Sequence, residues 1–430
     1  MIIHVVSGGE TLTGIAREYN VNIQDLAADN GLEPNLPLVV GQALAVQIPE
    51  VVHTVQRGET LSRIARQYGT TALELLRNNF KLGGSERIST GATINISYSS
   101  GQKTKSFASN SYAYPYINPS LLRKQLPYLT DFTPFTYGIS ESGGLVYQND
   151  AFMRNAANEY GVKNLLHLST LTENGGFSSE RTTLIFENEV LANALIDEIA
   201  DYASGEGFGG VDVDFEFIKP SEKYDYIRFL QELRLKLNPR GLELFSALAP
   251  KTSDSQSGTL YEGHDYAGIA AAVNYVLLMT YEWGYTYSEP MAVAPINSVA
   301  RVVRYALTRM PSDKIFMGIP TYGYDWVLPH VPGGAGAPSI SPVEAVNLAR
   351  RYGADILYDE TVQAPWFRYA DDDGRLHEVW FEDVRSITAK LALAASFDIY
   401  GIGYWNSMRD FPQNWVTLNA EYNIINFSLQ

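Results

Sequence analysis

The chain has 430 residues, 45% of them hydrophobic and 12% aromatic, so it can bury a large core and is long enough for more than one domain. Its 32 basic and 48 acidic side chains give a net charge of -16, which disfavours nucleic acid and anionic membranes as partners. No stretch approaches the roughly 20 apolar residues that span a bilayer, so we expect no membrane insertion. The amino terminus lacks a basic segment followed by an apolar one, so we expect no signal peptide. The absence of cysteine excludes disulfides and thiolate metal sites.

The first 98 residues contain two copies of one pattern. Gly-Glu-Thr-Leu at 9–12 recurs at 58–61, an offset of 49 positions (58 − 9 = 49). In each copy the threonine can cap a helix whose apolar residues follow at spacings of three and four, and a second helix and a short alternating strand come next. The sequence therefore predicts two small α+β modules, residues 1–49 and 50–98, each with the order strand, helix, helix, strand.

Both copies resemble LysM modules over nearly all of residues 1–98. The resemblance implies binding to N-acetylglucosamine polymers such as peptidoglycan or chitin, on the loops between strand and helix. The first module has 1 basic and 5 acidic residues and the second has 6 basic and 4 acidic residues, so the two need not bind glycan identically. The residues to which the resemblance assigns glycan contacts are Gly9, Thr11, Asn30, Gly58, Thr60 and Asn79.

A polar stretch at residues 99–108 is expected to be a linker, because its composition cannot support a packed element. Beyond it, apolar strand-like runs alternate with segments of helical period. Helical patterns cover residues 155–160, 187–202, 222–237 and 298–310. The strands are expected to begin near Ser111, Leu129, Val162, Gly210, Leu242, Asn274, Lys314 and Asp398. Eight strand–helix units predict a (β/α)8 TIM barrel, with a small α+β insertion at about 328–385 between the seventh and eighth strands.

The most informative segment is residues 207–218, Gly-Phe-Gly-Gly-Val-Asp-Val-Asp-Phe-Glu-Phe-Ile. Asp212, Asp214 and Glu216 share one face of this strand, and the valines and phenylalanines between and after them share the other. An apolar strand set among helices is typical of a parallel strand buried on both faces, where an unpaired carboxylate is costly. Closely spaced carboxylates raise the pKa of one of them, so one can stay protonated while another is ionised. The pattern therefore indicates a glycosidase.

Glu216 ends the fourth predicted strand, at the barrel end that carries the chemistry in this fold. From residue 107 to 430 the sequence resembles glycoside hydrolase family 18, the chitinase-like enzymes, whose fourth-strand motif is Asp-x-x-Asp-x-Asp-x-Glu. Further marks are Met279-Thr-Tyr281, Gly318-Ile-Pro-Thr-Tyr322-Gly and Tyr404-Trp405. We therefore expect a catalytic barrel over residues 109–430. Together with the LysM modules, it is similar to the bacterial spore cortex fragment-lytic enzymes.

The resemblance implies a mechanism in which the substrate's own 2-acetamido oxygen attacks the anomeric carbon, with retention of configuration. Glu216 would protonate the leaving oxygen and then activate water, Asp214 would orient the acetamide, and Asp212 would hold Asp214 in one coupled titration. Tyr281 would donate to the acetamide carbonyl, and Trp405 would form the floor beneath the sugar. The remaining candidate substrate-binding residues are Met279, Glu282, Tyr322 and Tyr137.

This mechanism requires a free 2-acetamido group on the reacting sugar. It therefore favours an N-acetylglucosaminidase acting on spore cortex peptidoglycan, with muramic δ-lactam on the leaving side, over an N-acetylmuramidase. A chitinase and a non-catalytic glycan-binding spore coat protein remain alternatives. We expect a monomer without cofactor, made in the mother cell and located at the cortex and coat boundary of the spore.

Three details of the sequence bear on these assignments. Gly209 stands where the family has its first aspartate, and Glu282 stands where an aspartate is common, so rate and specificity are open. A divalent metal at the acid cluster is the rival interpretation, but no histidine cluster accompanies the acids. Asp371-Asp-Asp-Gly is typical of a solvated turn. We therefore expect no metal site.

Overall fold

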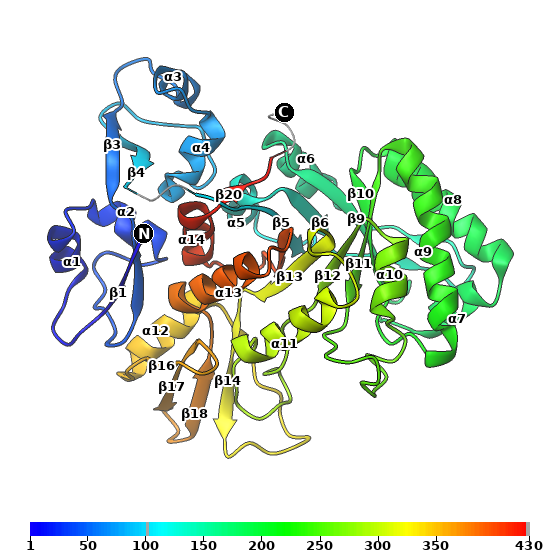
Figure 1. The fold of residues 1–430 in the computed structure, drawn as a ribbon. Helices are drawn as coiled ribbons and strands as arrows, with labels where there is room; N and C mark the ends of the chain where they lie inside the picture. The colour runs from blue at the N-terminus through cyan, green and yellow to red at the C-terminus, as the bar shows by residue number, and fades with distance from the viewer. Residues whose placement is uncertain (100–102, 427–430) are drawn as a thin grey trace.

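A computed structural model describes residues 1–99 and 103–426 of the chain (Figure 1). The predicted TIM barrel is confirmed, because a single ring of parallel strands closes on itself, with the last strand paired to the first. In ring order the barrel strands are β5 (Ser106–Ala113), β6 (Asp131–Pro134), β9 (Lys163–Leu171), β10 (Gly210–Asp214), β11 (Glu243–Leu248), β12 (Tyr275–Leu278), β13 (Ile315–Pro320) and β19 (Gly401–Trp405). Each of the eight lies within a few residues of its predicted start.

Helices cover the outside of the barrel. These are α5 (Pro119–Gln125), α6 (Ala151–Glu159), α7 (Glu180–Phe186), α8 (Glu189–Gly205), α9 (Lys223–Leu237), α10 (Tyr266–Ala272), α11 (Ile296–Leu307), α13 (Val384–Ser396) and α14 (Pro412–Glu421). Short 3-10 helices are η1 (Phe80–Leu82), η2 (Leu126–Tyr128), η3 (Pro220–Glu222), η4 (Asn238–Arg240) and η5 (Ser312–Lys314). Three small strands pair beside the ring: β7 (Tyr137–Ile139) with β9, β8 (Leu145–Val146) with β7, and β20 (Asn423–Ile424) with β5.

Two apolar layers hold the barrel together. The outer layer lies between strands and helices and includes Val211, Val213 and Leu230. The inner layer fills the barrel and includes Phe245 and Phe316. Large rings fit inside because glycines face them: a Cβ on Gly401 would lie 2.5 Å from the Phe316 ring. The barrel is therefore a packed core whose free space lies at its ends.

The predicted insertion follows β13. An antiparallel sheet, ordered β15-β14-β18-β17-β16, stands beside the barrel with one helix, α12, against it (Figure 1). Its elements are β14 (Gly323–Leu328), β15 (Ser339–Ile340), α12 (Pro342–Tyr352), β16 (Leu357–Asp359), β17 (Ala364–Ala370) and β18 (Leu376–Trp380). The insertion begins about five residues earlier than predicted, because the alternating run at 323–328 pairs with β18 and not with the barrel.

The two amino-terminal modules have the predicted order of elements. The first consists of β1 (Ile2–Val5), α1 (Leu12–Glu18), α2 (Ile23–Asp29) and β2 (Ala43–Val46). The second consists of β3 (Pro49–Thr54), α3 (Leu61–Gln67), α4 (Ala72–Arg77), η1 and β4 (Thr93–Tyr98). Thr11 and Thr60 cap α1 and α3 by accepting from the amides of Gly14 and Arg63, as predicted. Each module has its own small apolar core.

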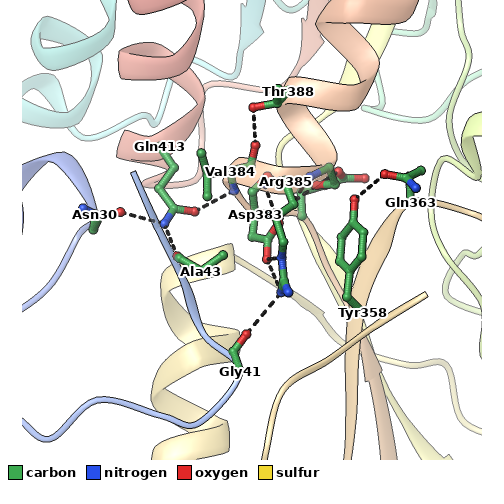
Figure 2. A network of polar contacts seen from close by, with 12 residues as sticks. Asn30, Gly41, Ala43, Tyr358, Gln363, Asp383, Val384, Arg385, Thr388 and Gln413 are labelled. Atoms are coloured by element: carbon green, nitrogen blue, oxygen red, sulfur yellow. Dashed lines mark hydrogen bonds and ion pairs between the residues drawn. The ribbon is translucent and has the colours of Figure 1, made fainter. Parts of the chain in front are cut away.

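The first module packs directly on the barrel domain. In Figure 1 it lies beside α13 and α14, which contact its strand β2. Figure 2 shows Gln413 of α14 donating to Asn30 Oδ1 and to the Ala43 carbonyl, both at 2.8 Å. Arg385 of α13 donates to the Gly41 carbonyl at 3.3 Å. The module is thereby fixed against the helices that flank β19.

The second module also contacts the barrel domain. The Arg77 side chain donates to the Pro127 carbonyl at 2.6 Å, and the Tyr128 hydroxyl donates to the Arg77 carbonyl at 2.8 Å. The predicted linker, 99–108, is too long by three residues, because β5 already begins at Ser106. Residues 100–102 of that linker lie outside the described residues.

Candidate active site

The acid motif lies on β10 and in the turn that follows it. Asp212 and Asp214 are the third and fifth residues of the strand, and Glu216 comes two residues after its end. Val211, Val213 and Phe215, which alternate with the acids, are fully buried. Strand alternation therefore gathers the three carboxylates at the carboxyl end of the barrel.

Asp212 is the deepest of the three acids and is fully buried. Its Oδ2 accepts a hydrogen bond of 2.6 Å from the hydroxyl of Tyr112, on β5. Burial raises the pKa of Asp212 to about 6, although His167 and the Tyr112 hydroxyl oppose this increase. Asp212 does not line the cleft, so it can act on substrate only through its neighbour Asp214.

Asp214 and Glu216 line the cleft. Burial raises the pKa of both carboxyls, and the charge of Asp214 raises the pKa of Glu216 further. A glutamic acid with a raised pKa keeps its proton near neutral pH, which is what a general acid needs. The electrostatics thus suit the roles that the sequence predicts for these two residues.

The turn after β10 is fixed by His264. The Ala249 amide donates to Nδ1 of this histidine at 3.0 Å, so Nε2 carries the proton and donates to the Phe215 carbonyl, also at 3.0 Å. Phe217 then adopts a left-handed conformation with φ 57 and is 51% exposed. The prediction that Phe217 shares the buried face of the strand is therefore wrong, because the turn directs this ring into the cleft.

The cleft has a volume of about 390 Å³ and is lined mainly by aromatic and apolar side chains. Trp405, at the end of β19, packs against Phe135 at 5.1 Å and Tyr112 at 5.6 Å between ring centroids. Tyr281 and Met279, just beyond β12, reach the same cleft. Three of the predicted substrate-binding and catalytic side chains thus meet where the acids open to solvent.

Glu282 also lines the cleft, but Tyr322, which was likewise predicted to bind substrate, does not. The hydroxyls of Tyr322 and Tyr324 both donate to the Glu282 carboxylate, the second at 3.1 Å. Glu282 has a left-handed φ of 65, which turns its side chain toward this pair. Tyr322 therefore orients Glu282 from behind, and the extra methylene relative to aspartate is accommodated by the two tyrosines.

The prediction that Tyr137 binds substrate is wrong. Its side chain is fully buried beside β9, and its hydroxyl donates to Asp150 at 2.9 Å. The ring packs against Tyr202 and Phe208, which lie on the outer side of the barrel wall and not in the cleft. The residue is a tyrosine of the outer core.

Two of the six predicted LysM contacts are also wrong. Asn30 is buried and makes three backbone hydrogen bonds, from its amide to the Leu26 and Ala45 carbonyls and from the Ala45 amide to its oxygen. Asn79 makes the equivalent three bonds in the second module. These asparagines tie the second helix of each module to its last strand, so they have no free group for a glycan.

The other four predicted contacts are accessible. Gly9, Thr11, Gly58 and Thr60 are exposed in the turn between the first strand and the first helix of their modules. Both glycines have a positive φ, 86 and 83, which is the conformation that favours glycine. The repeat of Gly-x-Thr is therefore explained by the turn and the cap, and the surface it forms is free for a ligand.

Several cleft residues were not predicted from the sequence. Tyr112 and Tyr114 lie two residues apart on and after β5, a spacing that places them on one face, so the pattern held a usable signal. Phe135, Phe177 and Tyr261 come from loops after other strands, and no spacing in the sequence indicates them. These rings complete an aromatic cleft around the acids.

Gly209 has a local explanation. A Cβ at this position would lie 2.0 Å from Cγ of Lys163, whose ammonium forms an ion pair with Asp131 at 3.1 Å. An aspartate could not be placed there unless the lysine moved. The aliphatic part of the Lys163 side chain thus occupies the space that the side chain of the motif's first aspartate would need.

Within residues 1–99 and 103–426, no group of three or more metal-ligating side chains is positioned to hold a metal ion. In the same ranges, every helix is too short or too polar to cross a lipid bilayer.

Comparisons with known proteins agree with the fold and the site. The family model "Glycosyl hydrolases family 18" matches residues 111–410, and the LysM domain model matches residues 4–47 and 53–97. The chain is 39% identical to a cortical fragment-lytic enzyme of Bacillus subtilis (strain 168), over 99% of each chain. It is 36% identical to the solved spore cortex-lytic enzyme SleL of Bacillus cereus, with a TM-score of 0.84 over 99% of each chain. The Bacillus megaterium SleL structure matches with a TM-score of 0.81 and 36% identity, over 99% of this chain and 98% of that one.

The family match over residues 111–410, together with a closed parallel barrel and carboxyl groups in an aromatic cleft, defines this protein as a glycoside hydrolase. The chain belongs to glycoside hydrolase family 18 and carries two LysM domains in front of its catalytic barrel. The sequence-based assignment to this family is confirmed.

Proposed function

We propose that this protein hydrolyses β-1,4 glycosidic bonds after N-acetylglucosamine in spore cortex peptidoglycan, with retention of configuration. The observation that carries the proposal is the pairing of Glu216, whose pKa is raised by burial, with Asp214 in the same cleft. The full-length likeness to cortical fragment-lytic enzymes supports cortex glycan as the substrate.

Glu216 starts the reaction as the acid. It donates its proton to the glycosidic oxygen as the bond to the anomeric carbon breaks, and the substrate's acetamido oxygen forms the new bond to that carbon. The glutamate, now ionised, removes a proton from the incoming water that opens the oxazolinium ring. A pKa raised by burial suits both steps of the reaction, since Glu216 must be protonated in the first step and act as a base in the second.

Asp214 orients the acetamide nitrogen and stabilises the positive charge that develops on it, and Asp212 holds Asp214 from behind. The Tyr281 hydroxyl donates to the acetamide carbonyl, and Trp405 stacks beneath the sugar ring. Met279 and Glu282 contact the sugar from the strand-β12 side of the cleft.

The mechanism selects the sugar on the reacting side. N-acetylglucosamine carries a free acetamido oxygen, whereas the nitrogen of muramic δ-lactam is tied into a ring. The lactam therefore occupies the leaving side. This assignment favours glucosaminidase over muramidase activity.

The LysM modules hold the enzyme on the glycan during germination, through the exposed turns that contain Gly9, Thr11, Gly58 and Thr60. Because both modules pack on the barrel domain of the same chain, the binding surface and the cleft move as one body in the monomer that we propose. We place the protein at the cortex and coat boundary of the spore, made in the mother cell.

The test is mass spectrometry of purified spore cortex fragments after incubation with the protein and with Glu216→Gln, followed by reduction of the new ends. We expect new N-acetylglucosamine reducing ends that the substitution abolishes. New N-acetylmuramic acid ends would replace the proposal with a muramidase. Cleavage of chitin oligosaccharides without cleavage of cortex fragments would replace it with a chitinase. Binding of cortex without cleavage of either substrate would overturn the catalytic proposal.

A further inference from the structure

His167 lies against the acid pair and has no role in the mechanism described so far. It is on β9, directly opposite Asp212 in the parallel register of β9 and β10, and it is fully buried. Its Nε2 lies 3.5 Å from Oδ2 of Asp214. A histidine is thus built into the barrel interior beside both carboxylates of the pair.

The ring of His167 is held on all sides. Nδ1 lies 2.6 Å from the Thr136 hydroxyl, the Phe135 ring lies over it at 4.7 Å, and the edge of Tyr112 meets it at 5.5 Å. The same Tyr112 donates to Asp212. These contacts leave the imidazole one orientation, with Nε2 toward Asp214.

The contacts of Thr136 also assign the tautomer. Its hydroxyl proton has acceptors at the Tyr137 carbonyl and the Ser169 hydroxyl, both at 2.9 Å, and at the His167 carbonyl at 3.3 Å, so the Thr136 oxygen can accept from Nδ1 of His167. On this basis we assign the proton to Nδ1, which leaves a lone pair on Nε2. Burial lowers the pKa of His167 to about 4, which keeps the ring neutral.

Three polar atoms at this point have no hydrogen-bond partner among the described residues: Nε2 of His167, Oδ1 of Asp212 and Oδ1 of Asp214. Buried polar atoms are costly when they are unpaired. An imidazole lone pair and the Asp214 oxygen 3.5 Å from it can form a hydrogen bond only if that carboxyl carries a proton. The cluster is therefore built to hold that proton.

We propose that His167 is a positioning residue for the acid pair: its Nε2 accepts a hydrogen bond from the carboxyl proton of Asp214 when that acid is protonated, across the 3.5 Å between Nε2 and Oδ2. The bond fixes the orientation of Asp214 and sets the pH at which Asp214 becomes charged. The groups that face this point are Asp212 and Asp214 on β10, Tyr112 on β5, Thr136 after β6, Ser169 on β9 itself and, further out, Glu216 and Tyr281. The inference rests on the proposed function of Asp214.

The variants that test it are His167→Leu, which removes the lone pair, and His167→Gln, whose side-chain carbonyl can replace it. Removing the acceptor disfavours the protonated pair, so the acid limb of kcat against pH moves to lower pH. For His167→Leu we expect the limb to shift by about one pH unit, because one hydrogen bond to the protonated form is lost. We also expect a roughly tenfold lower kcat with little change in KM. His167→Gln should return the limb to near its wild-type position.

Two outcomes overturn the inference. In the first, the acid limb of kcat against pH does not move in His167→Leu, and a smaller folded fraction explains the lower activity. The other is a limb that moves to higher pH, which would mean that Nε2 donates. Should His167→Leu fail to fold, ¹⁵N NMR of the histidine rings in the wild-type protein decides, because the inference requires Nδ1 protonated and Nε2 bare from pH 5 to 8.

A matched comparison separates this inference from the proposed function. If Glu216→Gln loses cleavage while the profile of His167→Leu is unchanged, only the role of His167 is wrong. If Glu216→Gln retains cleavage, the assignment of the acid itself is wrong.

Discussion

The acid strand of the barrel and the second helices of the LysM modules both bury polar side chains, with opposite outcomes. Asn30 and Asn79 are buried and fully hydrogen-bonded to backbone. Asp212 and Asp214 each keep a buried oxygen without a partner among the described residues, and burial raises their pKa values. A satisfied buried group holds the fold together, whereas an unsatisfied one stores electrostatic free energy that a reaction can use.

The largest effect is expected for Asp214→Asn, which keeps the shape and removes the charge. The acetamide would lose the carboxylate that stabilises its positive charge, so kcat should fall by roughly 100-fold to 1000-fold. The rate at which reducing ends are released measures kcat. The control is Asp372→Asn, on an exposed turn of the insertion. Unchanged kcat in Asp214→Asn would mean that the buried acid is structural, as the asparagines are.

The converse test uses Asn30→Ala and Asn79→Ala. Each substitution leaves buried backbone groups of its module unpaired, so the free energy of unfolding should fall by about 2 to 3 kcal/mol, while the cleft reaction of the folded protein is unchanged. Urea unfolding followed by circular dichroism measures the loss. Asn35→Ala, in the exposed loop after α2, should be close to neutral. A variant with unchanged free energy of unfolding that no longer binds cortex glycan would instead show that the asparagine contacts the ligand.

An intermediate effect is expected at Tyr112, the residue that links the acid pair to the barrel wall. Its hydroxyl donates to Asp212 and favours the ionised form, so Tyr112→Phe should raise the pKa of Asp212 beyond the present value of about 6. The acid limb of kcat should then move to higher pH by about one unit, opposite to the shift expected for His167→Leu. Tyr114→Phe, beside Trp405, is the control and should leave the limb in place. Equal shifts of the same sign in both variants would contradict separate roles for Tyr112 and His167.

The barrel and the acids were predictable because alternation along β10 is a local property. Asp212, Asp214 and Glu216 are two residues apart, so a strand must gather them. Tyr137 and Tyr322 could not be judged in this way, since which side of the barrel wall a tyrosine faces depends on strand register and helix packing. Phe135, Phe177 and Tyr261 reach the cleft through loops, which carry no periodicity.

The repeat was predictive of the fold but not of its ligand contacts. Asn30 and Asn79 recur because each module needs the same tie between helix and strand, and Thr11 and Thr60 recur as helix caps. The same packing that anchors the first module to α14 uses Asn30 once more, through Gln413. Such contacts join residues nearly 400 positions apart in the sequence, so no local sequence pattern predicts them.

The smallest effect is expected at the capping threonines, which are both structural and exposed. Thr11→Ala should lower the free energy of unfolding by about 1 kcal/mol, because α1 loses the acceptor for the Gly14 amide. Thr11→Ser keeps that acceptor and should restore stability. If the threonine methyl also contacts glycan, Thr11→Ser will still bind cortex more weakly than the wild type in a sedimentation assay with Glu216→Gln as background. If Thr11→Ser binds cortex as well as the wild type, and Thr11→Ala loses no more binding than its lower stability explains, Thr11 acts only as a helix cap. The glycan would then bind elsewhere on the module.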